Sequence, residues 1–140
     1  MAFWIIYALL SAIFAALVAI LGKIGLQNID STLATTVRAI VMALFLFFVS
    51  LSLGKFDLLH TLKSKVLIFI ILSGIAGALS WLFYFFALKT GLTSAVVAID
   101  RLSVVFVVIL SILFLGEHFN LYTAIGAVLM TIGAILMVIK

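Results

Sequence analysis

Five long apolar runs take up most of the chain and constrain its fold more than any other feature. They cover residues 3–22, 33–53, 66–88, 93–115 and 121–139. About 20 apolar residues, rising about 1.5 Å each in an α-helix, cross the hydrocarbon core of a bilayer. The sequence therefore predicts an all-α membrane protein with five transmembrane helices. The breaks between the runs are too short for a separate domain, so residues 1–140 are expected to form a single transmembrane domain.

The composition excludes a water-soluble globule. Hydrophobic residues make up 69% of the chain and charged residues 9%, which is too little polar surface to cover a soluble domain. There is no Cys, so a disulfide framework and a cysteine metal site are both excluded. The Lys residues are spread over the ends of the apolar runs and form no nucleic-acid footprint. We expect a multi-pass protein of the plasma (inner) membrane, in contact with the lipid bilayer, with no cofactor, metal or nucleic-acid partner.

The first apolar run is expected to remain as a helix. It is longer than the core of a signal peptide, and no Lys or Arg precedes it. Small residues recur along it at helical spacing, which lets another backbone approach closely; they are Ala12, Ala15, Ala16, Ala19 and Gly22. Lys23 follows this stripe. It either extends to the lipid headgroups or serves as a ligand for a solute.

The run 93–115 holds Asp100 and Arg101 side by side. A charge at the centre of a membrane helix costs about 2.5 to 3.5 kcal/mol on insertion scales, so each of these residues requires a partner or a wet cavity. Adjacent residues on a helix do not face each other, so the partners must lie elsewhere. Arg38 and Lys23 are candidate partners for Asp100, because their helix ends fall on the same side when five spans alternate in direction. A polar clamp between helices and a role in transport are both open.

Arg38 and an aromatic segment supply further candidates. Arg38 lies about 1.5 turns into the run 33–53, where it either extends to the interface or acts within the membrane. Trp81 and Tyr84 are three residues apart and share a helix face. They form either an interfacial aromatic belt or the wall of a pocket for an apolar or cationic solute.

The end of the chain carries two more features. Glu117 and His118 follow the fourth run and form either a proton-handling pair or an ordinary solvated turn. In the last run, the near-repeat AIGAVLM and TIGAILM places Gly126 and Gly133 on one helix face. This face predicts a packing seam or a dimer seam.

Four features follow one another along the chain: Arg38 early in the second run, and the passages FYFFALKTGLTSAVVAIDRLSVVF, ILSILFLGEHF and GAVLMTIGAIL. Taken in order, they resemble the EamA repeat of the drug/metabolite transporter superfamily, and the resemblance covers essentially the whole chain. It implies one five-helix repeat, where full-length members join two repeats of opposite orientation. A chain that resembles the half-size type implies a homodimer that rebuilds the ten-helix unit. Members of the superfamily export amino acids, nucleotide precursors and toxic compounds, so the resemblance leaves the substrate open.

The Lys residues show no bias between the two membrane faces. One side bears Lys55, Lys63 and Lys65, and the other bears Lys23, Lys89 and Lys140. A chain without a positive-inside bias can insert in both orientations, which predicts dual topology and an antiparallel homodimer. Counting Arg38 and Arg101 makes the balance five to three, so a parallel dimer stays open.

The leading hypothesis is a secondary transporter that exports small organic metabolites or drugs by alternating access, through a cavity between two copies. Asp100 would be the proton- or cation-sensitive carboxylate, because a low-dielectric environment favours the neutral form of a carboxylate. Arg38 or Arg101 would clamp an anion, and Trp81 with Tyr84 would line the cavity. Lys23 and Glu117 are further candidates for substrate binding or coupling.

Two other functions are open. One is a non-transporting membrane scaffold or accessory subunit, and the other is a lipid-carrier flippase. An enzyme is not expected, because the sequence has no H-E-x-x-H, no Cys and no paired catalytic carboxylates. The sequence also lacks GxxxxGK[ST], so direct use of ATP is not expected.

Overall fold

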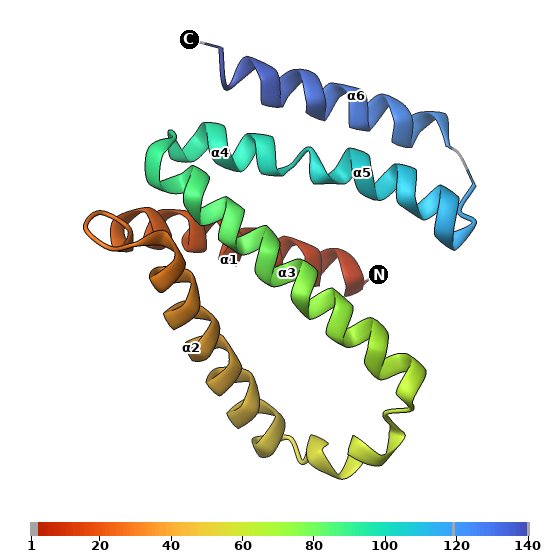
Figure 1. The fold of residues 1–140 in the computed structure, drawn as a ribbon. Coiled ribbons are helices and arrows are strands. Elements are labelled where there is room, and N and C mark those ends of the chain that lie inside the picture. The colour runs from red at the N-terminus through yellow and green to blue at the C-terminus, as the bar shows by residue number, and fades with distance from the viewer. Residues whose placement is uncertain (1–2, 119, 140) are drawn as a thin grey trace. The chain divides into compact units, whose positions relative to one another are not determined.

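The computed structural model describes residues 3–118 and 120–139 and is built from helices throughout its length (Figure 1). In chain order these are α1 (Phe3–Gly25), α2 (Ser31–Ser52), η1 (Lys55–Thr61), α3 (Ser64–Thr90), α4 (Thr93–Asp100), α5 (Ser103–Leu110), η2 (Ser111–Leu115) and α6 (Leu121–Leu136). The segment η1 is a 3₁₀-helix and η2 is a turn of π-helix. The predicted all-helical fold class is confirmed.

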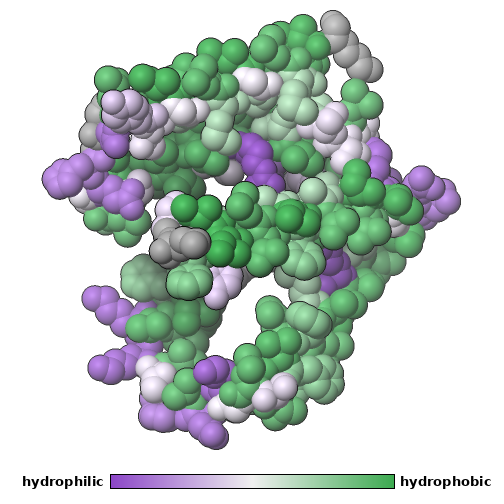
Figure 2. All heavy atoms as spheres, turned by 180° about the vertical axis from the view of Figure 1, so that it is seen from behind, coloured by the Kyte–Doolittle hydropathy of each residue, from purple (hydrophilic) through white to green (hydrophobic). Residues whose placement is uncertain are grey.

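Four helical segments are long and apolar enough to cross a membrane. They are Phe3–Gly25, Ser31–Ser52, Ser64–Thr90 and Thr93–Leu115, and they hold 22 to 27 residues each. Many large apolar side chains on these helices are exposed; Phe45, for example, is 67% exposed. Hydrophobic residues also cover most of the face seen in Figure 2. Helices that are apolar all round must be covered by lipid or by other protein, so the chain is a multi-pass integral membrane protein.

The helices divide into two compact units. Residues Gly22–Lys89 form one of them, called here the α2–α3 unit. Residues Met1–Leu21 and Thr90–Lys140 form the other, called here the α4–α6 unit.

In the α2–α3 unit, α2 begins two residues before the apolar run that predicted it, because Asp30 caps its N-terminus. The Asp30 carboxylate accepts the N–H groups of Thr32 at 2.9 Å and Leu33 at 3.0 Å. These donors would otherwise lack helical partners. The hydrogen bond from Leu33 is the largest influence that holds the pKa of Asp30 below its usual value. The other end of α2 is followed by Gly54, whose φ of 62° is a left-handed conformation that favours glycine.

The start of α2 lies close to the end of α3, and the two helices diverge towards η1 (Figure 1). At the close end, the Lys23 ammonium donates to the carbonyl oxygens of Leu88 at 2.6 Å and Lys89 at 3.2 Å. Lys89 donates in turn to the Ile29 carbonyl at 3.0 Å. The last carbonyls of a helix have no partners within it, so Lys23 caps the C-terminus of α3.

Gly22 permits the last turn of α1 to approach α3 closely at this junction. A Cβ atom at Gly22 would lie 3.3 Å from the Phe85 ring and 3.4 Å from a Leu88 methyl group. Leu88 is fully buried and Phe85 is 3% exposed. The last member of the predicted stripe of small residues is therefore in contact with a neighbouring helix.

In the α4–α6 unit, α6 lies beside α4 and α5 (Figure 1). Its buried residues are Ala127 and Ala134. A Cβ atom added at Gly126 or Gly133 would meet no other atom within 4 Å. The alanine face of α6 is thus packed within the chain, and the predicted glycine seam is open.

The helix α6 is shorter than the predicted fifth span, which extended to residue 139. It starts after Asn120, whose side chain accepts the N–H of Tyr122 at 2.9 Å, and contains 16 residues. Beyond Leu136 the regular helix gives way to turn hydrogen bonds, such as the 3.0 Å bond from the Val138 N–H to the Ile135 carbonyl. The apolar pattern marks which residues are in the membrane, and these last residues remain apolar although the helix has ended.

Candidate functional site

Arg38 is stacked on an aromatic ring inside the α2–α3 unit. It lies seven residues after Ser31, which places its Cα about 10 Å along α2. The guanidinium carbon is 3.5 Å from the centroid of the Trp81 ring and 5.5 Å from that of Phe85. Both distances are within the range of a cation–π interaction. The half-buried Arg38 side chain is therefore engaged with α3 within the membrane-spanning part of the unit.

Three rings on α3 form the aromatic cluster, which consists of Trp81, Tyr84 and Phe85. The Trp81 and Tyr84 centroids are 5.4 Å apart with an interplanar angle of 76°, and the Trp81 and Phe85 centroids are 6.0 Å apart at 60°. These are edge-to-face contacts, a favoured arrangement for aromatic pairs. Sequence reasoning selected Trp81 and Tyr84 and missed Phe85. Helical spacing could have identified Phe85, because it follows Trp81 by four residues and shares its helix face.

No carboxylate pairs with Arg38 among residues 22–89. The sequences of α2 and α3 contain no Asp or Glu, and the two acidic residues of the unit are Asp30 and Asp57. Asp30 caps α2, and Asp57 lies in η1. A guanidinium presents five N–H donors in its plane, while stacking on a ring uses its face. Arg38 can therefore accept an anion at its edge without losing its contact with Trp81.

The α4–α6 unit holds the other predicted charged pair, at a break between two helices. The run 93–115 was expected to be one uninterrupted α-helix, but it tightens at Arg101 and Leu102. The N–H of Leu102 donates to the Ile99 carbonyl at 2.9 Å, and the N–H of Val104 donates to the Arg101 carbonyl at 3.1 Å. Both bonds span three residues, as in a 3₁₀ turn. No Gly or Pro lies in this run, so nothing in its sequence marked the break.

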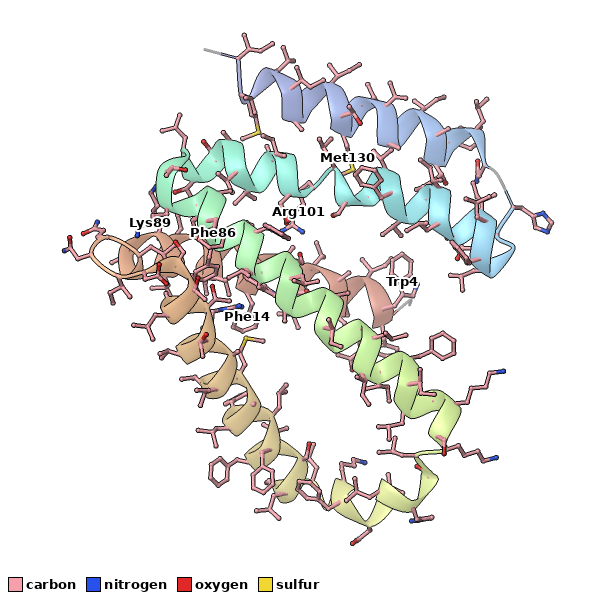
Figure 3. The ribbon with its side chains drawn as sticks, in the orientation of Figure 1. Trp4, Phe14, Phe86, Lys89, Arg101 and Met130 are labelled. Atoms are coloured by element: carbon pink, nitrogen blue, oxygen red, sulfur yellow. The ribbon has the colours of Figure 1, made fainter. Side chains whose placement is uncertain are left out.

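Asp100 and Arg101 are exposed on this break. In the described part of the chain no ion pair joins them to each other, which agrees with the rule that adjacent helical residues do not face one another. Figure 3 shows Arg101 projecting from the turn on the side opposite α6. Irregular backbone at membrane depth is tolerated where protein or a watered cavity covers it. The backbone at this break therefore requires contact with other protein or with a water-filled cavity.

The segment after α5 ends at a glycine turn. Gly116 has a φ of 67°, a left-handed conformation that stops the helix. The N–H of Glu117 donates to the Ser111 carbonyl at 3.3 Å across this turn. Glu117 and His118 are exposed in the turn. The Leu-Gly-Glu sequence thus has a structural role as the terminator of the helix.

The structure brings three of the seven predicted site residues together, namely Arg38, Trp81 and Tyr84, and adds Phe85 to them. Lys23, in the same α2–α3 unit, is engaged at the C-terminus of α3. Asp100, Arg101 and Glu117 belong to the α4–α6 unit.

Comparisons with known proteins agree with a membrane protein built from apolar helices. The sequence pattern of the EamA-like transporter family matches residues 2–139. A protein of Sinorhizobium sp described as an uncharacterized transporter in the cobO 3' region is 38% identical over 136 residues, which is 97% of this chain and 96% of that relative. No solved structure matches the chain significantly. A family match over nearly the whole sequence, together with a relative aligned from end to end, shows that the chain belongs to the EamA-like transporter family.

Proposed function

We propose that the protein is a secondary transporter that exports small organic solutes across the plasma membrane by alternating access. The observation that carries this proposal is the Arg38 guanidinium, which is stacked on Trp81 at 3.5 Å and is paired with no carboxylate among residues 22–89. Ionisable residues within membrane helices are costly and mark solute pathways. A charge that is not paired with a carboxylate of its own unit has capacity to bind a solute.

The break at Asp100 and Arg101 supports the same function. Secondary transporters bind substrates and coupling ions where membrane helices are discontinuous near the middle of the bilayer. Asp100 lies seven residues after the start of α4, as Arg38 does in α2. The Cα atom of each residue therefore lies about 10 Å from the start of its own span. Asp100 is our candidate for the group that couples transport to protons or cations.

A homodimer completes the proposal. The Gly126 and Gly133 face of α6 has no neighbour within 4 Å, and small residues at such spacing allow helices to approach closely in membranes. Two copies paired through this face would bring two five-helix repeats together, as in transporters built from repeats. The even distribution of Lys residues supports an antiparallel pair.

The test is solute flux in proteoliposomes that contain the purified protein. A panel of organic anions, amino acids, organic cations and neutral drugs is loaded under an imposed pH gradient. We expect flux of at least one class, and its loss in Arg38→Gln. The matched control is Lys65→Gln, which removes one positive charge about 24 Å along α3 from Trp81. Vesicles that are inert to the whole panel would indicate a scaffold or an accessory subunit.

A second measurement tests the antiparallel arrangement. Tags at both termini are labelled in intact cells with an impermeant reagent. Labelling of each tag in about half of the molecules would support dual insertion. Labelling of a single orientation would contradict the antiparallel dimer and leave a parallel one.

A further inference from the structure

The charged residues of the helices α2 and α3, called here the α2–α3 pair, are all positive. Arg38 is the only charged residue of α2, and the charges of α3 are Lys65 and Lys89, each one residue from an end of that helix. Within residues 22–89, the interior of this pair is therefore cationic. An organic cation would meet an uncompensated like charge in a low-dielectric environment, where Coulomb repulsion is strong.

The orientation of the guanidinium selects the group that it binds. Its face lies over the Trp81 ring at 3.5 Å and close to the Phe85 ring at 5.5 Å. Its in-plane N–H groups have no carboxylate partner among residues 22–89. Two parallel N–H donors match the two oxygens of a carboxylate, and this bidentate pair is the strong form of the interaction.

The single positive charge of Arg38 limits the net charge of the ligand. One guanidinium neutralises one negative charge, so a phosphate dianion would bring a second, unneutralised charge into the membrane interior. A zwitterionic amino acid would bring an ammonium group, and α2 and α3 contain no carboxylate to receive it. A monoanion without an amino group fits the residues that are present.

The aromatic cluster indicates what kind of group is attached to the carboxylate of the ligand. Trp81 and Tyr84 are half-buried, and their rings meet edge to face. Further aromatic rings pack favourably on such a cluster at centroid distances of about 4.5 to 7 Å. A ligand whose carboxylate is at Arg38 would therefore place a planar apolar group against these rings.

We propose that the α2–α3 pair binds an aromatic monocarboxylate, with the carboxylate on the edge of Arg38 and the ring against Trp81 and Tyr84; this names the cargo of the transport function proposed above. Arg38 is the residue that distinguishes anions from cations. Trp81 has two roles, since it supports the guanidinium and contacts the cargo.

The fluorescence of Trp81 provides a test that does not depend on transport. The chain contains two tryptophans, Trp4 and Trp81, so Trp4→Phe leaves Trp81 as the single indole. This variant is titrated in detergent or nanodiscs at pH 7 with phenylacetate, with its neutral analogue phenylacetamide and with the phenethylammonium cation. We expect a saturable change in emission with phenylacetate. The other two ligands should bind at least tenfold more weakly, as should phenyl phosphate and phenylalanine.

Variants in the same background identify the residue responsible. Arg38→Gln should abolish the response to phenylacetate, and Arg38→Lys should weaken it at least tenfold because the bidentate fork is lost. Lys65→Gln should leave it unchanged. Size-exclusion profiles in detergent verify that each variant is folded. If Arg38→Gln is unstable, Arg38→Lys takes its place in the test, because it keeps the positive charge and removes only the bidentate fork.

Three outcomes would overturn the proposal: no response to phenylacetate, binding of the amide or ammonium analogue as tight as that of phenylacetate, or full binding by Arg38→Gln. Failure of transport is distinguishable from these outcomes. Selective phenylacetate binding without flux would support the anion site and contradict the transport function. Flux of another solute class with no phenylacetate binding would support transport and overturn the anion site.

Discussion

The ammonium of Lys23, at the end of α1, donates to the carbonyl of Leu88, near the end of α3, at 2.6 Å. This bond joins residues that are 65 positions apart, and Lys89 makes a return bond to Ile29 in the loop before α2. The ends of three helices are thereby held in one junction. Because Phe85 and Leu88 belong to this junction, it fixes the segment of α3 on which Arg38 is stacked.

Gly22 is the position in this junction where added volume should be most damaging. Gly22→Leu would force a side chain against Phe85 and Leu88, which a single Cβ atom would already approach to 3.3 and 3.4 Å. Overpacking of this kind costs about 1 to 3 kcal/mol. Thermal unfolding in detergent, followed by circular dichroism, should show a lower midpoint. Gly25→Leu is the control, since nothing lies within 4 Å of a Cβ atom there; equal midpoints for the two variants would contradict the packing described.

Loss of the hydroxyl group should change the free energy of unfolding in opposite directions at Ser31 and Thr35. The Ser31 hydroxyl is buried without a hydrogen-bond partner in the described part of the chain. Ser31→Ala should therefore raise the free energy of unfolding by about 1 kcal/mol. The Thr35 hydroxyl donates to the Ser31 carbonyl at 2.7 Å, so Thr35→Val should lower it by about 0.5 to 1.5 kcal/mol. Chemical unfolding in mixed micelles measures both, and destabilisation by Ser31→Ala would show that its hydroxyl has a partner.

Asp30 should make stability dependent on acid pH. Its pKa in the folded chain is lowered, first by the hydrogen bond from the Leu33 N–H. A lowered pKa contributes stability above the unfolded value of about 3.9, and this contribution is lost as pH falls through the folded value. Unfolding midpoints measured between pH 7 and pH 3 should therefore fall more steeply for the native chain than for Asp30→Asn, which can cap the helix but does not titrate. Parallel curves would rule out Asp30 as the group responsible.

Asp100 is expected to set the pH dependence of flux. Asp100→Asn removes the carboxylate at the break between α4 and α5, so transport by this variant should lose its response to an imposed pH gradient. Flux in proteoliposomes over a range of external pH measures this. Asp57→Asn, in the exposed η1 segment, is the control and should behave like the native chain. Native pH dependence in Asp100→Asn would exclude Asp100 from coupling.

The two faces of α6 should differ in oxidative cross-linking. The chain has no Cys, so introduced thiols report only their own positions. An antiparallel pair brings Gly126 of one copy beside Gly133 of the other, and both positions are open. The double variant Gly126→Cys with Gly133→Cys should therefore form a disulfide-linked dimer in membranes. The control is Ala127→Cys with Ala134→Cys, which should not cross-link because both alanines are buried. Cross-linking of the alanine variant without cross-linking of the glycine variant would place the dimer seam elsewhere.

The sequence was sufficient to locate the apolar helices, because a membrane span is set by length and hydrophobicity alone. It was less informative about their ends. Asp30 is a typical N-cap residue and could have moved the predicted start of α2 from Leu33 to Ser31. The break at Arg101 and Leu102 could not be predicted, because a change from four-residue to three-residue hydrogen bonds needs no Gly or Pro.

The candidate site was predictable in part. Trp81 and Tyr84 are close in sequence and share a helix face, so their contact follows from helical spacing. The stacking of Arg38 on Trp81 does not, because the two residues are 43 positions apart and their approach depends on how α2 packs against α3. The capping role of Lys23 is another contact of this kind. It links Lys23 to the carbonyls of Leu88 and Lys89, whereas the sequence indicated either a headgroup contact or a solute ligand.

The length of α6 has a consequence for the surrounding lipid. Its 16 residues extend about 24 Å, whereas the acyl-chain layer is about 30 Å thick. The apolar residues 137–139 that follow the helix cover part of this difference. Thinner leaflets or shorter-chain lipids beside the helix accommodate the rest, at a cost of a fraction of a kcal/mol per ångström. The glycine face of α6 would then be surrounded by a compressed annulus, and its removal from that annulus would favour association of two such helices.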